Sequence, residues 1–226
     1  MKIKVVDSPS VDPREFDLPE GFKEEHLEDV VEIFNTPLVG HYNWDYTDAD
    51  TRIKKLYELG KELNWNGSID LDWSKGLKKG EPPIKAELIA RMEGPLAALP
   101  EEERLEYMRH DQAWALSQFL HGEQGALLVA SQLVSCAPTY QAKLYAASQT
   151  FDEARHVEVF ARYLQQIHGL EYPINKNLKS LIDKILSDKR WDLKFIGMQI
   201  IIEGLALAAF QTTKETSNCP LLRQLV

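Results

Sequence analysis

Asp152-Glu153-Ala154-Arg155-His156, at the centre of residues 149–160, is the stretch on which the interpretation of the whole chain depends. Glu153 and His156 are three residues apart, and residues at this spacing share one face of an α-helix. A carboxylate beside an imidazole is a common unit of transition-metal sites. No other Asp or Glu in the chain precedes a histidine by three residues. The pair is therefore the first candidate for a metal site, the alternative being an ordinary pair on an exposed helix surface.

Helical phasing favours the metal site, because it places the pair on an inward face. Steps of three and four residues from Glu153 meet mostly apolar or small side chains, namely Ala142, Ala146, Gln149, Phe160 and Ile167. About thirty residues earlier, Glu123 interrupts a second apolar stripe, which consists of Leu116, Leu120, Leu127, Ala130 and Val134. Glu123 is thus a second inward acid, either a metal ligand or a buried acid with a hydrogen-bond partner.

A third acid lies in the most apolar segment of the chain, residues 196–210. Glu203 is the only ionisable group in this segment, and a helix that is apolar on all sides is expected to be buried. An unpaired buried carboxylate costs roughly several kcal/mol unless it is neutralised or coordinated. Three helices are therefore expected to point one acid each into the core, where a cation such as iron or manganese would compensate their charges together.

The composition limits the remaining possibilities. The 226 residues are 44% hydrophobic, enough for one core, and the net charge of −9 argues against nucleic acid as a partner. Cys136 and Cys219 lie far apart in sequence, so no disulfide framework is implied and a reducing compartment is the simpler interpretation. No secretory signal is expected, because residues 1–7 contain no long apolar run, and the 196–210 run is shorter than the about 20 apolar residues that span a bilayer. A cytoplasmic protein without membrane contact is expected.

Apolar periodicity predicts an all-α protein with long helices. The expected long helices cover about 99–134, 140–168 and 191–216, with a shorter one near 177–188. Residues 96–226 should form the helical bundle, and residues 1–95 an irregular N-terminal section with short helices, among them one near 24–34 and one that is capped by Thr47 or Asp48 and ends near Leu63. A short strand is expected at Ile3 to Val6. The cluster of His41, Tyr42, Trp44 and Tyr46 is expected to pack over the core or to line a pocket.

The acids also follow a repeat. Glu123 is followed thirty residues later by Glu153-x-x-His156, and the same spacing after Glu203 would put a second such pair near position 233, beyond Val226. Ferritin-like di-iron bundles take one Glu from each of two helices and one Glu-x-x-His from each of two others. Measured against that set, one glutamate and one histidine are missing. The sequence is therefore expected to be a piece of a longer protein or to need a second chain to complete its site.

Three motifs resemble the ferritin-like di-iron carboxylate superfamily, in the branch of the ribonucleotide reductase small subunit and bacterial oxygenases. They are His-Gly-Glu123-Gln-Gly-Ala-Leu, Asp-Glu153-Ala-Arg-His156-Val-Glu-Val-Phe and Ile-Ile-Glu203-Gly-Leu-Ala. A further segment, Asn64-Trp65-Asn66-Gly-Ser-Ile-Asp70-Leu-Asp72-Trp73, resembles one that precedes the bundle in aminobenzoate N-oxygenases and benzoyl-CoA epoxidases. The resemblance covers roughly residues 50 to 226 and implies a ferritin-like long-helix bundle.

The resemblance also implies roles for individual residues. Glu123 and His156 would be ligands of one iron, Glu153 would bridge, and Glu203 would serve the other iron. Asp152 would orient a metal-bound histidine through its second ring nitrogen, although the histidine concerned belongs to the missing half. For two residues near these ligands, Gln149 and Phe160, no role as a metal ligand is expected. Gln149 either faces a substrate cavity or simply packs. Phe160 occupies the position of the radical tyrosine in reductase small subunits, which argues against a tyrosyl-radical subunit.

The expected function is that of a di-iron oxidoreductase, in which manganese or a mixed manganese–iron pair would also fit. It would use O₂ to hydroxylate, N-oxygenate, epoxidise or desaturate a small organic substrate, with an electron-donor protein as partner and a homodimer as the expected assembly. One alternative is a ferroxidase or iron-handling protein, which the irregular first section disfavours. The other is a non-catalytic helical scaffold, whose acids would be paired with basic groups from other helices. Arg155 and Glu158 are expected to form solvated or interhelical ion pairs.

Overall fold

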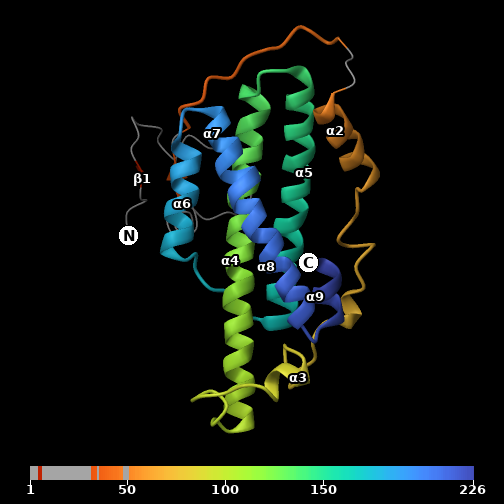
Figure 1. Cartoon of the computed structure of the whole chain (residues 1–226), viewed down its shortest axis with the longest axis vertical. Helices are drawn as coiled ribbons and strands as arrows, with labels where there is room; N and C mark the ends of the chain where they lie inside the picture. The colour runs from red at the N-terminus through yellow and green to blue at the C-terminus, as the bar shows by residue number, and fades with distance from the viewer. Residues whose placement is uncertain (1–4, 7–31, 35, 48–50) are drawn as a thin grey trace, which may run out of the picture.

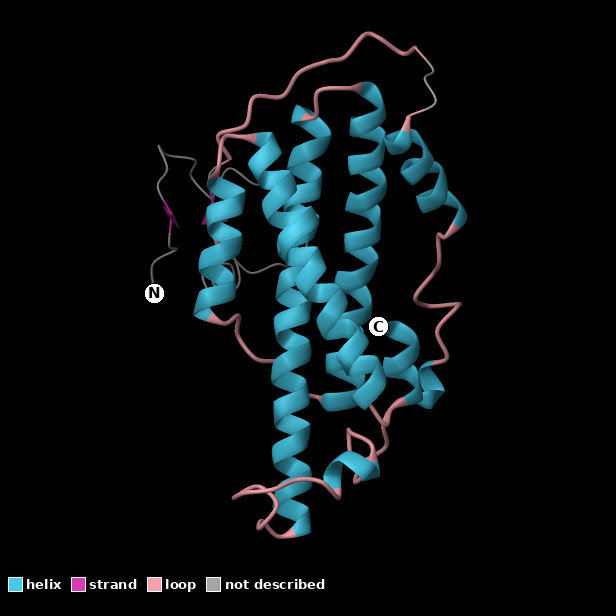
Figure 2. Cartoon of the chain, viewed as in Figure 1, coloured by secondary structure: helices cyan, strands magenta, loops and turns pink. Residues whose placement is uncertain are grey.

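The protein is an all-α helical bundle, as expected, in a computed structural model that describes residues 5–6, 32–34, 36–47 and 51–226 (Figures 1 and 2). Within these residues the only strands are Val5–Val6 (β1) and Ile33–Phe34 (β2), which pair in parallel. β1 falls inside the strand expected at Ile3 to Val6. Of the short helix expected near 24–34, residues 24–31 lie outside the described part of the chain. Ile33 and Phe34 form the strand β2, so the prediction of a helix is wrong for these two residues.

Two long helices form the centre of the bundle. They are Glu101–Cys136 (α4) and Tyr140–Tyr163 (α5), which run side by side and make the most extensive contact between any two described elements (Figure 1). α4 begins after Pro100, with three glutamates in its first turn, where the helix dipole favours negative charge. α5 begins at Thr139, whose side chain accepts a hydrogen bond from the backbone of Ala142. Because the connection between them is short, the two helices are antiparallel neighbours.

The chain then returns along the α4–α5 pair. α5 continues into a π-helical turn, Leu164–His168 (η3), which Gly169 closes with a left-handed φ of 61° that favours glycine. Next come Lys176–Ser187 (α6) and one continuous helical path made of Trp191–Phe195 (α7), the π-helical Ile196–Ile202 (η4) and Glu203–Thr216 (α8). Pro220–Leu225 (α9) ends the chain. The helices expected from the sequence in this half are therefore confirmed, with the π-helical turns as additions.

The prediction that residues 196–210 are buried is wrong. Ile200, Leu205 and Leu207 are 57, 66 and 67% exposed, because η4 and α8 lie across the outside of the α4–α5 pair and no described element covers their outer side (Figure 1). Apolar composition on all sides requires packing partners on all sides, and the described residues supply them on one side only. By length and composition alone, Trp191–Thr216 would suffice to cross a bilayer, and 11% of its most apolar window is buried.

Two expectations for the N-terminal section are also wrong. The N-cap of the helix Arg52–Glu62 (α2) is Thr51, whose hydroxyl accepts from the backbone of Lys54, and not Thr47 or Asp48. α2 lies against α5 but buries no residue fully. Tyr42 and Trp44 stack on each other in the loop before α2, but both rings are exposed, so they neither line a pocket nor pack over the core. The shorter elements Trp73–Lys75 (η2) and Ala86–Ile89 (α3) connect α2 to α4.

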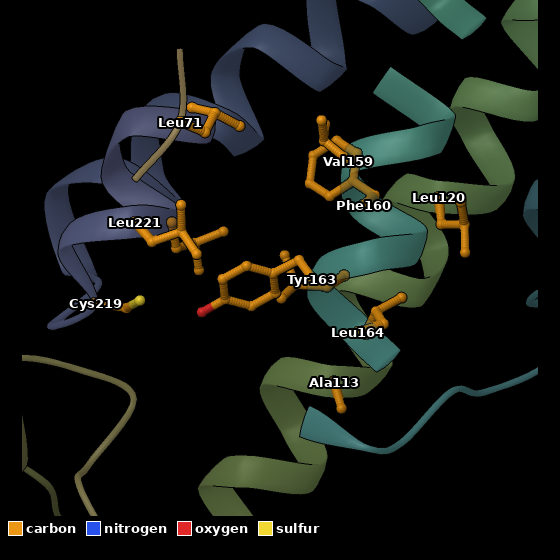
Figure 3. Close-up of a cluster of buried hydrophobic side chains, with 11 residues drawn as sticks. Leu71, Ala113, Leu120, Val159, Phe160, Tyr163, Leu164, Cys219 and Leu221 are labelled. Atoms are coloured by element: carbon orange, nitrogen blue, oxygen red, sulfur yellow. The ribbon is translucent and has the colours of Figure 1, made fainter. Parts of the chain in front are cut away.

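The core consists of two clusters of buried side chains. One joins the C-terminal part of α4 to α6, to Ala146 of α5 and to the start of η4. The other joins α4 and α5 to the C-terminal residues, and Figure 3 shows Tyr163 of α5 pointing its hydroxyl toward Cys219 beside Leu221. Cys136 and Cys219 are both buried free thiols, so the structure contains no disulfide between them. The C-terminal segment is thereby held on the same helix that carries Glu153 and His156.

His168, at the end of η3, is buried and makes a testable contribution to stability. Its Nε2 lies 3.1 Å from Oε1 of Gln112, and burial, together with the charge of Arg109, lowers its pKa to about 4. In the unfolded chain the same imidazole is protonated below about pH 6.5. Stability is therefore fully present above pH 6.5 and is lost as the pH falls toward 4, by on the order of 3 kcal/mol.

We expect urea unfolding between pH 7 and pH 4 to register this loss, and a His168→Gln variant to lose less over the same interval. Glutamine keeps an N–H donor for Gln112 but does not titrate. The same substitution at the exposed His41 is the matched control and should leave the wild-type profile unchanged. Identical pH profiles for wild type and His168→Gln would contradict the assignment.

Candidate metal centre

Three of the four expected metal ligands meet between α4 and α5. The ligand atoms of Glu123, Glu153 and His156 all lie within 4.8 Å of one another. Nδ1 of His156 is 3.2 Å from Oε2 of Glu123 and 3.2 Å from Oε2 of Glu153. Both carboxylate side chains are buried, with 6 and 7% exposed, whereas the imidazole is 34% exposed. The arrangement is a compact set of two carboxylates and one imidazole with a single more open side.

Local helix geometry explains how this group forms. Glu153 and His156 lie one turn apart on α5, so both side chains face α4. On α4, Glu123 takes the inward position between Leu120 and Ala126, both of which are buried. Because the two helices are antiparallel neighbours, the inward positions of one lie opposite those of the other. The sequence stripes therefore correspond to real faces of packed helices.

The electrostatics of the group are those of an acid-rich site that is removed from water. Burial raises the pKa of Glu153 to about 7, against the opposing effect of its hydrogen bond to His156 and with a further increase from Glu123. Burial alone would lower the pKa of His156, but its hydrogen bonds to Glu123 and Glu153 raise it to about 10. Without another cation, the imidazole is thus the charge that balances the two acids. A metal ion bound there would displace that proton and take its place.

Glu203, the fourth expected ligand, lies near this group but is not part of it. It is the first residue of α8, directly after the π-helical η4, and its carboxylate makes no hydrogen bond or ion pair with any described residue. Its pKa is raised to about 7 by burial and by the negative charge of Glu153. Glu203 and Glu123 line the same cavity between α4, α6 and α8. Glu203 therefore borders the candidate site through this cavity, but its carboxylate lies outside the three-ligand group.

Arg155 is buried behind the site, so the expectation of a solvated or interhelical ion pair is wrong for this residue. Its guanidinium pairs with Asp152 on the same helix and donates to Oδ1 of Asn64 at 2.6 Å and to the backbone oxygen of Trp65 at 2.7 Å. It also lies over the ring of Trp65, at 4.9 Å from the centroid. The carboxylate of Asp152 is therefore paired with an arginine, and no described histidine donates a hydrogen bond to it. Glu158 is exposed.

The Asn64–Trp73 segment, on which part of the resemblance depends, packs closely on α5. A Cβ at Gly67 would lie 2.4 Å from Cγ1 of the buried Val159, so only glycine fits this approach. The indole nitrogen of Trp73 donates to the backbone oxygen of Gly67 at 2.7 Å. Asp70 and Asp72 accept backbone hydrogen bonds within the turn, as expected for a solvated turn. The ring of Trp65 faces that of His156 at 6.3 Å, so this segment also borders the candidate site.

Gln149 and Phe160 flank the ligands along α5. The side chain of Gln149 donates to Oε1 of Gln199 in η4, while Oε1 of Gln149 and Nε2 of Gln199 are buried without a described partner. Gln149 thus connects α5 to the segment that presents Glu203. Phe160 is buried and contacts Phe119 and Phe210, whose ring centroids lie 5.9 and 5.7 Å away. Among the described residues, no hydrogen bond joins Gln149 to Glu123, Glu153 or His156, and Phe160 has no ligand atom.

Sequence reasoning missed two residues close to the site. Tyr145 has a raised pKa because of its burial and the charges of Asp152, Glu153 and Glu203, which places it near the acids. Gln199 lies inside the apolar run 196–210 and bonds to Gln149 of α5. Both had a usable signal, because Tyr145 lies two turns before Glu153 on one face of α5 and Gln199 precedes Glu203 by four residues, as Gln149 precedes Glu153.

Comparison of the chain with protein-family models, with curated proteins and with solved structures gave no match. The functional argument therefore depends on the geometry of the site.

Proposed function

We propose that Glu123, Glu153 and His156 bind a transition-metal ion, and that the protein is an oxidoreductase of the di-iron carboxylate type that uses O₂ to oxidise a small organic substrate. The observation that carries the proposal is the convergence of the three ligand atoms within 4.8 Å between two buried helix faces. One imidazole and two carboxylates suit iron or manganese. The resemblance of the motifs to the ferritin-like superfamily supports the same function.

The residues present fit such an ion. Glu123 and Glu153 share the one imidazole of His156, and the carboxylate of Glu203 is half-buried without a described partner, so among the described residues the three acids have a single positive charge beside them. A cation held by Glu123, Glu153 and His156 would favour their metal-binding protonation states. Glu203 is the proposed ligand of a second ion. Four side chains do not fill the coordination shells of two ions, so further ligands must come from water, from another segment or from a second copy.

Each residue of this chain then has a definite task. Glu123 and His156 would hold the first ion from two different helices, and Glu153, one turn from His156 on α5, would be a ligand beside them. Arg155 holds Asn64 and Trp65 against α5, and so positions the indole ring that faces His156. Iron, when bound, would supply the electrons with which O₂ is reduced. The protein contributes ligand geometry, an apolar surrounding and access for the substrate.

The scaffold alternative receives support from one contact, because His156 of α5 does pair with Glu123 of α4. Such a scaffold needs every buried acid to have a basic partner. Glu203 has none among the described residues, and burial raises its pKa. Metal removal separates the two interpretations, since chelators would leave a scaffold unaffected.

The proposal is tested by adding Fe²⁺ or Mn²⁺ to chelator-treated protein without oxygen, and then admitting O₂ to the iron-loaded sample. We expect at least one ion bound per chain, a rise in thermal stability that corresponds to about 2.7 kcal/mol at a metal concentration 100 times the dissociation constant, and an O₂-dependent change in absorbance. A Glu158→Gln variant, which alters an exposed acid on α5, should behave like the wild type. Absence of bound metal would refute the proposal.

A further inference from the structure

A cavity of about 240 Å³ lies beside the candidate metal ligands, between α4, α6 and the η4–α8 segment. Most of its wall is apolar. The lining residues used below are Phe119, Gly122, Leu178, Leu181, Leu205 and Phe210. Leu181 and Leu205 line it and are also exposed, at 41 and 66%, so they form its mouth on the protein surface. The cavity therefore connects solvent to the side of the bundle on which the acids lie.

The polar groups in this cavity are few and lie together. Gln118 borders it, but its amide is already engaged: Oε1 accepts from the backbone of Asn175 at 2.6 Å, and Nε2 donates to the backbone oxygen of Pro173 at 3.2 Å. Among the described lining residues, Glu123 and Glu203 are then the only side chains with polar atoms left to bind a ligand. A guest would thus meet apolar walls and two carboxylates.

The aromatic part of the wall favours a ring. Phe119 and Phe210 stand edge to face, with centroids 4.9 Å apart at 88°, and Phe160 backs both of them. A third ring placed against such a pair gains further edge-to-face or offset contacts. The size also fits, because an engineered apolar cavity of about 150 Å³ lined by Leu, Ile and Phe binds benzene. About 240 Å³ accommodates one ring with a small substituent.

We propose that this cavity binds one uncharged monocyclic aromatic group, with the ring against Phe119 and Phe210 and its edge toward Glu123 and Glu203. The apolar walls disfavour a ring that carries its own carboxylate, because moving a charged group from water into an apolar cavity is costly. As a statement about substrate, the inference rests on the proposed metal function. As a statement about binding it does not, since the cavity is formed by the chain alone.

Two glycines provide a matched pair of variants. A Cβ added at Gly122 or at Gly204 would meet no atom within 4 Å, so both positions accept a larger side chain without a clash. Gly122 lines the cavity, whereas Gly204 does not. Gly122→Leu should therefore fill the cavity, and Gly204→Leu should leave it open. Ala206→Leu fills the cavity from the opposite wall and guards against an unforeseen effect of the first variant.

The experiment measures the binding of toluene and of benzoate to the chelator-treated protein, by ligand-observed NMR and by thermal shift. For wild type and Gly204→Leu we expect saturable toluene binding with a dissociation constant on the order of 0.1–1 mM. We expect at least a tenfold weaker affinity in Gly122→Leu and Ala206→Leu, and no saturable binding of benzoate to the wild type. Fe²⁺ binding is measured on the same samples, so that failure of the cavity and failure of the metal site give different results.

Three outcomes would overturn the inference. The first is a wild type that does not bind toluene saturably, and the second is equal affinity in wild type, Gly122→Leu and Ala206→Leu. The third is a toluene affinity that falls as the protein concentration rises, in parallel with dimer formation in sedimentation, which would mean that a second copy fills the cavity. Toluene binding without any Fe²⁺ binding would support the cavity and refute the metal proposal.

Discussion

His156→Ala is expected to lower the affinity for Fe²⁺ or Mn²⁺ by about 100-fold or more. The imidazole is the only nitrogen donor in the group, and even residues that merely support a metal-bound histidine change affinity by 10–100-fold when they are replaced. The loss should be seen in a competition titration against a chelator of known affinity. Thermal stability in the absence of metal is recorded in parallel, because the substitution also removes the positive charge beside Glu123 and Glu153.

His121→Ala is the matched control. His121 lies on α4, two residues before Glu123, but its Nε2 contacts the backbone oxygen of Tyr172 at 2.8 Å on another side of the helix. Its replacement removes an imidazole of similar exposure close to the site and should leave metal affinity within about twofold of the wild type. Equal affinities in His156→Ala and the wild type would exclude the imidazole as a ligand, whatever metal the protein contains.

The features that sequence predicted correctly are those that depend on near neighbours. The course of α4 and α5 follows from apolar periodicity, from Pro100 and its acids at one end and from Gly169 at the other. The pairing of Glu153 with His156 is a property of one helix, because a separation of three residues fixes their relative direction. The convergence of Glu123 with that pair required only that two antiparallel helices turn their apolar stripes toward each other.

The features that sequence missed depend on what packs against a segment. The apolar composition of residues 196–210 identified a surface that needs covering, yet it does not say whether the chain supplies the cover, and the structure leaves Leu205 and Leu207 exposed. The sequence predicts a solvated or interhelical ion pair for Arg155 because its buried acceptors, Asn64 Oδ1 and the oxygen of Trp65, lie about ninety positions away. The position of Glu203 relative to the other ligands is likewise set by the packing of η4, and no spacing rule reports it.

Lys194 is a buried residue whose role depends on packing that the sequence alone does not show. Lys194→Ala is expected to lower the free energy of unfolding by about 4 kcal/mol. The side chain is fully buried, and its Nζ donates to Oε1 of Gln132 at 2.7 Å and to the backbone oxygens of Ile185 at 2.8 Å and Leu186 at 2.5 Å. The two backbone acceptors belong to the last turn of α6, where carbonyls lack partners within the helix. Alanine would leave Oε1 of Gln132 and the oxygen of Leu186 without this donor, while the oxygen of Ile185 keeps its bond from the backbone of Asp188 at 3.3 Å. Each buried acceptor left unpaired costs about 1–3 kcal/mol, and the cavity adds to this loss.

Urea unfolding at pH 7 measures this loss of stability. Two further variants provide a surface control and separate the contributions of packing and hydrogen bonding. Lys189→Ala changes an exposed lysine just before α7 and should alter stability by less than about 0.5 kcal/mol. Lys194→Met keeps most of the apolar stem but no donor, so it separates packing from hydrogen bonding. A methionine variant nearly as stable as the wild type would show that the lysine's hydrogen bonds only balance its own desolvation. If methionine is as damaging as alanine, the three hydrogen bonds hold α6 to the start of the segment that presents Glu203 to the candidate site.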